Sequence, residues 1–235
     1  MARVYFTDLR TNPKRSLLDK IEDLLDRIKT KERIKKSDLT AIKLHFGEKG
    51  NIAYIRPVFI RKIGDYIKRL GARPFITDTN TLYSGSRSDS VNHINTAIYN
   101  GFDYASTGCP IIIADGIRGS NSVKVSIDGE ILKEVSIAGD IVNADSLVVV
   151  THFKGHELSG FGGALKNLGM GCAAREGKLI QHSNVAPKVN EETCKGCGSC
   201  TTYCSVCAIS VTEKKAFIDP EKCIGCGECI IICPF

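Results

Sequence analysis

Nine of the eleven cysteines in this chain lie between residues 194 and 233, where their spacing is typical of iron–sulfur ligands. Separations of two, two and three residues occur twice, in the sets Cys194, Cys197, Cys200, Cys204 and Cys223, Cys226, Cys229, Cys233. Three cysteines at such intervals wrap a tight turn around one cuboidal cluster, and the fourth lies beyond that turn. An intracellular chain seldom uses thiols for disulfides, and an odd number cannot all pair, so metal binding is the leading interpretation.

The two sets form an internal duplication, because every ligand recurs 29 positions later, as do the glycines at 196 and 198. Glycine permits the backbone conformations and the close N–H approaches to sulfur that such a turn requires. The fourth cysteine of each set is expected to reach the other cluster. We therefore predict two [4Fe-4S] clusters, one held by Cys194, Cys197, Cys200 and Cys233 and the other by Cys223, Cys226, Cys229 and Cys204.

The segment from residue 194 to 234 resembles the bacterial two-cluster ferredoxins. It departs from their pattern at Ser205, where a proline normally follows the fourth cysteine. The first copy continues into an expected hairpin at 208–211 and 216–218, whereas the second stops at Phe235, so the chain looks truncated. The alternative ligand is zinc, which also binds paired C-x2-C units. Cys109, Cys172 and Cys207 fall outside the repeat, and we expect them to be small buried hydrophobic residues.

The first 190 residues alternate between helix and strand patterns. Apolar residues at helical spacing follow Asn12 and Pro13, which predicts a cap at Asn12 and an amphipathic helix that extends to Ile28. Further helices are expected at about 57–70 and 88–100, and strands at 3–6, 39–46, 74–77, 110–114, 122–126 and 146–151, the last of them buried. The alternation predicts an α/β domain over residues 1–185, with a mainly parallel sheet flanked by helices. A small α+β domain of the two-cluster ferredoxin type is expected over residues 186–235.

Polar residues follow three of the predicted strands. The first group is His45 and Glu48, the second is Asp78, Asn80, Thr81 and Tyr83, and the third is His152, Lys154 and His156. The carboxyl ends of parallel strands share one edge of a sheet, and ligands bind in the crevice there. We therefore predict such a crevice, with His45, Asp78 and Asn80 among its cofactor-binding residues.

A glycine-rich stretch at 151–169 supplies the rest of the predicted site. Its cofactor-binding candidates are Gly160, Gly162, Gly163 and Asn167, since glycines before a helix let free N–H groups approach an anion. Its catalytic candidates are His152, His156 and Lys166. The histidines could bind a divalent metal with His45 or Asp78, one of them could act as a general base, or they could only hydrogen-bond the loop backbone. The glycine order matches neither a Walker loop nor a dinucleotide fingerprint.

Three segments resemble the family called domain of unknown function 362. They are Asp78 to Arg87, His152 to His156, and Gly160 to Cys172. The likeness covers most of residues 1–190 and implies no assigned activity, although members often carry an inserted two-cluster ferredoxin unit. A shorter stretch, His152 to Lys166, is similar to the nickel-pincer lactate racemases. That likeness implies His152 or His156 near a catalytic centre and Lys166 near a cofactor or substrate anion.

Length and composition limit the classes of protein to which this chain can belong. With 235 residues and 43% hydrophobic content, the chain can bury one sizeable core and a small second unit, which excludes a disordered or fibrous protein. Cluster thiolates would reduce the formal net charge of +6, and aromatic residues make up only 7%, so we expect no nucleic-acid partner. No segment approaches the ~20 apolar residues of a membrane-spanning helix, and the N-terminus lacks signal-peptide order, so we expect a cytoplasmic protein.

The leading hypothesis is a redox protein whose two [4Fe-4S] clusters relay single electrons to or from a substrate in the α/β crevice. It implies a redox partner protein and an anionic small-molecule substrate. Two alternatives stand beside it. The cluster unit could be an electron carrier or docking module with the α/β domain as a scaffold, or the clusters could be structural in a non-redox enzyme.

Overall fold

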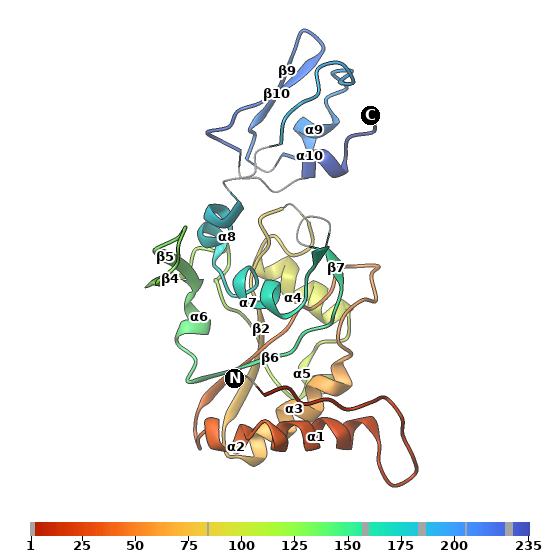
Figure 1. The fold of residues 1–235 in the computed structure, drawn as a ribbon, viewed down its shortest axis with the longest axis vertical. Coiled ribbons are helices and arrows are strands. Elements are labelled where there is room, and N and C mark those ends of the chain that lie inside the picture. The colour runs from red at the N-terminus through yellow and green to blue at the C-terminus, as the bar shows by residue number, and fades with distance from the viewer. Residues whose placement is uncertain (1–2, 84, 157–159, 183–186, 205, 224–227) are drawn as a thin grey trace.

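The computed structural model describes residues 3–83, 85–156, 160–182, 187–204, 206–223 and 228–235. Its central feature is a four-stranded parallel sheet in the order β3-β2-β1-β6, of which β2 and β6 are labelled in Figure 1. The strands are β1 (Leu39–Lys43), β2 (Arg73–Asp78), β3 (Ile111–Ile113) and β6 (Ser146–Val149). Because all four run in the same direction, their carboxyl ends lie along one edge. The predicted α/β class with flanking helices is confirmed.

One apolar core joins the sheet to the helices around it. Ile42 of β1 is fully buried and lies in register with Ile76 of β2 and Val148 of β6. The longer helices are α1 (Leu17–Arg27), α3 (Pro57–Arg69) and α4 (Ser90–Tyr99). Ile60 and Ile67 of α3 lie on one helix face and pack into the same core as Ile42. The sheet and its strand ends therefore sit on a rigid support.

The N-terminal region differs from the prediction. Helix α1 begins at Leu17 rather than beside Asn12, because Ser16 and Asp19 form a capping box. Residues 3–6 are not paired as a strand, and Val4 and Phe6 are 91% and 86% exposed. The prediction of a strand there is wrong, since a strand-like alternation still needs a neighbouring strand for its hydrogen bonds.

The strand predicted to be buried at 146–151 is also corrected. It forms β6, which ends at Val149 and is only half-buried, with Leu147 40% exposed. Its partner among the described strands is β1, and β6 lies at one edge of the sheet. A continuous apolar run predicts burial on both faces only for a central strand.

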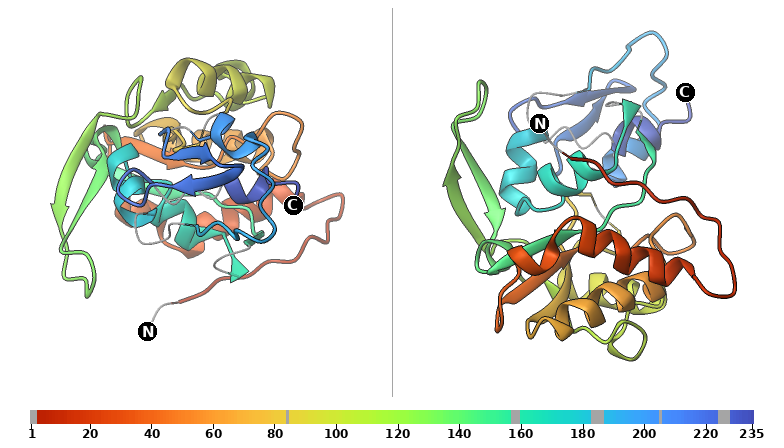
Figure 2. Two further views of the ribbon diagram at one scale, coloured as in Figure 1. Left: turned by 90° about the horizontal axis from the view of Figure 1, so that it is seen from above. Right: turned by 60° about the horizontal axis from the view of Figure 1, so that its bottom comes forward.

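Short elements complete the first part of the chain. Two of them form the hairpin β4 (Ser122–Ser126) and β5 (Glu134–Ala138), which projects from the body (Figure 2). The others are α2 (Thr30–Arg33), α5 (Tyr104–Thr107), α6 (Gly139–Val142), β7 (Gly155–His156), β8 (Gly160–Phe161), α7 (Ala164–Gly169) and α8 (Arg175–His182). None of the helices in the described ranges has the combined length and apolar character needed to cross a bilayer.

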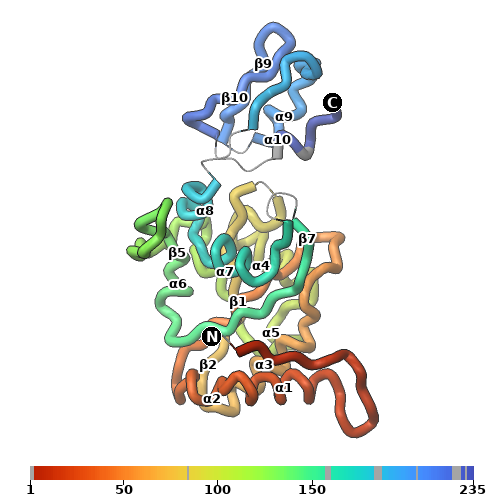
Figure 3. The backbone as a smooth tube through the Cα atoms, in the orientation of Figure 1, coloured from red at the N-terminus to blue at the C-terminus, as the bar shows by residue number. Residues whose placement is uncertain are grey.

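The cysteine-rich region folds as a group of its own (Figure 3). It contains α9 (Ser199–Thr202), β9 (Ile209–Thr212), β10 (Lys215–Ile218) and α10 (Glu228–Ile231). The predicted hairpin is confirmed as the antiparallel pair β9–β10. Its two turn residues, Glu213 and Lys214, both have left-handed φ, as a tight two-residue hairpin turn requires. The predicted domain boundary at 185/186 lies outside the described residues and stays a prediction.

Candidate functional site

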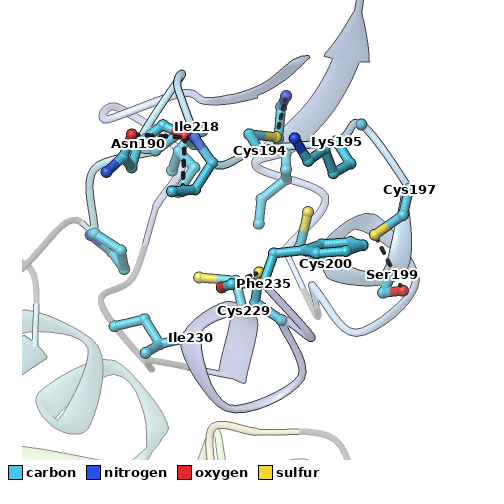
Figure 4. Close-up of a pocket in the computed structure, with 18 of the residues that line it drawn as sticks. Asn190, Cys194, Lys195, Cys197, Ser199, Cys200, Ile218, Cys229, Ile230 and Phe235 are labelled. Atoms are coloured by element: carbon cyan, nitrogen blue, oxygen red, sulfur yellow. Dashed lines mark hydrogen bonds between the residues drawn. The ribbon is translucent and has the colours of Figure 1, made fainter. Parts of the chain in front are cut away.

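A cavity of about 240 Å³ lies within the cysteine-rich region and is lined by five cysteines (Figure 4). Four of them, Cys194, Cys197, Cys200 and Cys233, are the ligands predicted for the first cluster. Three come from the first copy of the repeat and the fourth from the second copy. The fold thus brings cysteines that are far apart in sequence to one cavity. The fifth lining cysteine, Cys229, belongs to the other predicted set, so the division of ligands between two clusters stays a prediction.

Glycines shape the turn that carries the first three cysteines. Gly196 and Gly198 both have positive φ, at 63° and 78°. A Cβ atom added to Gly196 would lie 2.4 Å from the backbone carbonyl of Lys214 in the β9–β10 turn. The close approach of the cysteine turn to the hairpin therefore depends on the absence of a side chain at residue 196.

Hydrogen bonds to sulfur favour the thiolate form of two of these cysteines. The Ala216 N–H donates to Cys194 Sγ at 3.4 Å, and this bond, with a further one from Gly196 and the charge of Lys215, lowers the pKa of Cys194. Ser199 lowers the pKa of Cys197 through its side chain and its backbone. The thiolate is the form that binds a metal.

Cys200 shows the opposing effect. Burial raises its pKa, and the thiolates of Cys197, Cys194 and Cys233 add to the increase. The four side chains are therefore close enough to influence one another electrostatically. Without positive charge among them, this burial and repulsion favour the protonated form of Cys200.

The donor set and its arrangement fit a [4Fe-4S] cluster. Thiolate sulfurs are the usual ligands of such clusters. Each thiolate binds a different iron of the cube, so the sulfurs surround a volume and do not meet at one point. In the described ranges no three His, Cys, Asp or Glu side chains are grouped to hold a single metal ion. The cysteines that line the cavity instead surround a space.

The structure describes only some of the cysteines in the second predicted ligand set. Of the second predicted set, Cys226 lies outside the described residues, Cys229 borders the cavity already described, and Cys204 Sγ accepts a hydrogen bond from Ala208 N at 3.2 Å. This second set stays a prediction. Cys109 and Cys172 are buried as expected. The same expectation is wrong for Cys207, which is exposed in the turn that follows Cys204.

At the carboxyl edge of the parallel sheet, a buried lysine links three elements. The Lys43 ammonium, at the end of β1, donates to Asp78 Oδ1 at 2.9 Å, to Asn167 Oδ1 at 2.7 Å and to the Leu44 carbonyl at 3.0 Å. Lys43 is 1% exposed and Asp78 is 4% exposed. Two predicted site residues, Asp78 and Asn167, are therefore joined by a third that the sequence reasoning missed.

Asp78 is the centre of charge in this network. Burial alone would raise its pKa, but Lys43, His93 and Arg87 outweigh burial and hold the pKa well below its usual range. Its second oxygen lies 3.4 Å from Arg87 Nη1 and 3.6 Å from His93 Nε2. His93 is fully buried with its ring nearly perpendicular to that of Phe46, and burial lowers its pKa. Asp78 is thus ionised and surrounded by the chain's own groups.

Arg87 extends the network toward the surface. Its Nε donates to Glu48 Oε1 at 2.8 Å, and the Tyr83 hydroxyl donates to the same oxygen at 2.9 Å. Arg87 lowers the pKa of Glu48 against the effect of burial, while burial raises the pKa of Tyr83. The polar residues after β1 and β2 therefore do converge, as the sequence predicts for strand ends on one edge.

His45 joins the third strand end. Its ring lies edge-on to that of His152, with centroids 5.8 Å apart. His45 Nδ1 accepts the Gly47 N–H at 2.9 Å, which places the ring proton of the neutral form on Nε2. Burial, and next the charge of Arg87, lower the pKa of His45 to about 4. In this conformation neither ring nitrogen of His45 offers a free lone pair to a metal.

His156 and Lys166 form a second contact on this edge. His156 Nε2 lies against the Lys166 ammonium, and β7–β8 holds the pair near Lys154 through the Gly162 N–H to Lys154 carbonyl bond of 2.9 Å. Burial and the charge of Lys154 lower the pKa of Lys166. Gly160 and Gly163 have positive φ, a backbone conformation that favours glycine. Residues 157–159 of this stretch lie outside the described residues.

Asn80 faces away from the Lys43 network. Its backbone N–H donates to Asp115 at 3.0 Å, and its side-chain amide donates to Asp115 and to the Gly116 carbonyl. Burial raises the pKa of Asp115 to about 6 and lowers that of nearby Lys178 to about 8. Lys178 donates to Thr79 Oγ1 at 2.6 Å. Asn80 therefore belongs to a second group of buried polar residues after β2 and β3, which Thr79 connects to the first because its N–H donates to Asp78 Oδ1 at 2.9 Å.

Comparison with known protein families gives two matches. The family model described as Domain of unknown function (DUF362) matches residues 40–216, and that described as 4Fe-4S binding domain matches residues 216–235. The first match contains the strand-end network and the first four repeat cysteines. The second contains Cys223, Cys226, Cys229 and Cys233. Searches of the curated proteins and of the solved structures give no match.

Removing the Lys43 ammonium is predicted to leave a buried negative charge without its main partner. We expect Lys43→Met to lower the free energy of unfolding by about 3–5 kcal/mol, as measured by urea denaturation. Lys124→Met is the control, because Lys124 pairs with Glu134 at the surface and its loss should cost less than about 1 kcal/mol. Adding Asp78→Asn to Lys43→Met should recover part of the loss. Equal effects of the two single substitutions would contradict the account.

His45 is predicted to make stability depend on pH. Its pKa is about 4 in the folded chain against an ordinary 6.5, so the unfolded chain binds more protons in this window, and folding weakens as pH falls through it. Between pH 7 and pH 5 the loss should be about 2 kcal/mol. His45→Asn keeps an acceptor for the Gly47 N–H but does not titrate. The stability difference between wild type and variant should shrink by that amount at pH 5, and a constant difference would rule the mechanism out.

Proposed function

The chain belongs to the family described as Domain of unknown function (DUF362), and we propose that it is a cytoplasmic iron–sulfur redox protein that relays single electrons between a partner protein and a substrate. The observation that carries this proposal is the cavity lined by Cys194, Cys197, Cys200 and Cys233. The match of residues 216–235 to a 4Fe-4S binding domain supports it. A bound [4Fe-4S] cluster supplies one-electron transfer. We propose two clusters with crossed ligands in residues 186–235, and a substrate site in residues 1–185.

The proposed substrate is a small anion at the carboxyl edge of the parallel sheet. Lys166 and Lys154 bring two positive charges together, and the charge of Lys154 raises the cost of charging Lys166. An anion would relieve that cost. His152, His156 and Lys166 are the proposed catalytic residues, and the contact between His156 Nε2 and Lys166 Nζ supports a proton exchange between these two. An anion fits this edge better than a divalent metal, because His45 and Asp78 already serve other partners.

A second candidate function is electron carriage, with the α/β domain as a scaffold. The observation in its favour is the closure of the Lys43 network. All three ammonium protons have acceptors within the chain, and both Asp78 oxygens have cationic neighbours. Groups so satisfied hold a fold together without a ligand.

The two candidates differ in how the reduced protein responds to small anions. The relay function predicts that one member of a panel of carboxylates and phosphate esters speeds anaerobic reoxidation of reduced protein, followed by the visible absorbance. Lys166→Met should then slow that reoxidation at least tenfold. A carrier would show neither effect, while still passing electrons to a protein acceptor.

The cavity makes a specific prediction about metal content. After anaerobic reconstitution, Cys200→Ala should lose about half of the iron and acid-labile sulfide, because only the cluster bound at this cavity loses a ligand. Cys172→Ala is the matched control, since Cys172 is buried outside the repeat and should retain the wild-type content. Equal iron in both variants, or wild-type protein that takes up zinc and no iron, would overturn the proposed function.

A further inference from the structure

The hairpin β9–β10 places two consecutive residues against the same ligand. The Ala216 N–H donates to Cys194 Sγ at 3.4 Å, and the Lys215 ammonium donates to the Cys194 carbonyl at 2.8 Å. Lys215 also donates to the Glu191 carbonyl, three residues before Cys194. The hairpin therefore holds the start of the cysteine turn from one side, close to the cavity that Cys194 lines.

The charge of Lys215 is not neutralised in the described part of the chain. The Lys215 ammonium donates its two hydrogen bonds in the described ranges to backbone carbonyls. Lys222, in the same region, instead forms an ion pair with Asp219 at 3.0 Å. Lys215 is also only partly exposed. A cation that is fixed by two carbonyls and shielded in part from water acts on its surroundings more strongly than a mobile surface lysine.

We propose that Lys215 raises the reduction potential of the cluster bound through Cys194. This inference rests on the proposed iron–sulfur function and adds a residue to it. Reduction brings one electron, and so one more negative charge, to the cluster. A fixed cation nearby stabilises the reduced form more than the oxidised form, and net charge near the cluster is one of the factors that set its potential. The Ala216 N–H to sulfur bond acts in the same direction.

The test is a redox titration of the reconstituted full chain, followed by electron paramagnetic resonance. Lys215→Met should shift the midpoint potential of one cluster to more negative values, and Lys215→Glu should shift it further. Lys215→Arg keeps the charge and should stay near wild type. Lys124→Met removes the same charge from hairpin β4–β5 and serves as the control for net charge, with no shift expected.

The series separates charge from structural support. The Met and Glu variants both lose the bonds to the two carbonyls, and Glu adds a negative charge, so equal potentials in these two variants would overturn the proposal. Unchanged potentials in all variants that keep full iron content would overturn it as well, while leaving the iron–sulfur function intact. A wild-type protein that assembles no cluster would instead defeat the proposed function. Added salt should reduce the difference in midpoint potential between wild type and Lys215→Met, because salt screens an electrostatic effect.

Discussion

Mutual repulsion among thiolates that surround one cavity is the constraint on which the cysteine-rich region depends. The pKa of Cys200 reflects this repulsion. Burial raises that pKa, and the negative charges of the Cys197, Cys194 and Cys233 thiolates raise it further. Two groups of the β9–β10 hairpin offset part of this repulsion. The Ala216 N–H donates to Cys194 Sγ, and the Lys215 ammonium lies close by, bonded to the Cys194 carbonyl. These groups only moderate the repulsion, and a cationic metal core removes most of it. Metal binding at this cavity is therefore expected to be coupled to deprotonation of its thiols.

The parallel sheet resolves a similar problem without any bound group. Asp78 is buried with Lys43, Arg87 and His93 around it, and the positive partners hold it in its ionised form. Buried ion pairs add little net stability, because the cost of removing charges from water offsets their attraction. The geometry of these pairs instead fixes how β1, β2 and α7 meet, since Lys43 of β1 donates to Asp78 of β2 and to Asn167 of α7. The two regions of the chain thus differ. The buried charges at the sheet edge are compensated by the chain's own side chains, whereas under the proposed function the cysteines of the cavity are completed by a bound cluster.

The sequence was sufficient for features that follow from local periodicity and spacing. The parallel sheet, the helix beginning at Pro57 and the β9–β10 hairpin all follow from such patterns. Features that depend on a distant partner were missed or misjudged. The strand expected at 3–6 has no pairing partner in the described part of the chain, and β6 is half-exposed because it lies at an edge. Neither the pairing of residues 3–6 nor the edge position of β6 can be predicted from local composition.

The same distinction applies to the site. Strand-end polarity predicted that His45, Asp78 and His152 would lie along one edge, and the contacts of His45 with His152 and of Asp78 with Asn167 through Lys43 agree with it. Lys43 carried a usable signal, a single charge within the apolar run Ala41-Ile42-Lys43-Leu44, because a buried lysine needs a partner. His93 and Lys215 carried none, since their roles arise from packing between elements far apart in the sequence.

The most direct test of the account is X-ray absorption at the iron edge of the anaerobically reconstituted full chain. Bound [4Fe-4S] clusters predict a sulfur shell around iron together with a short iron–iron shell, because each iron of the cube has iron neighbours. A spectrum with sulfur neighbours but no iron–iron shell would show isolated metal ions held by cysteine. That result would contradict the claim that these cysteines enclose a cluster.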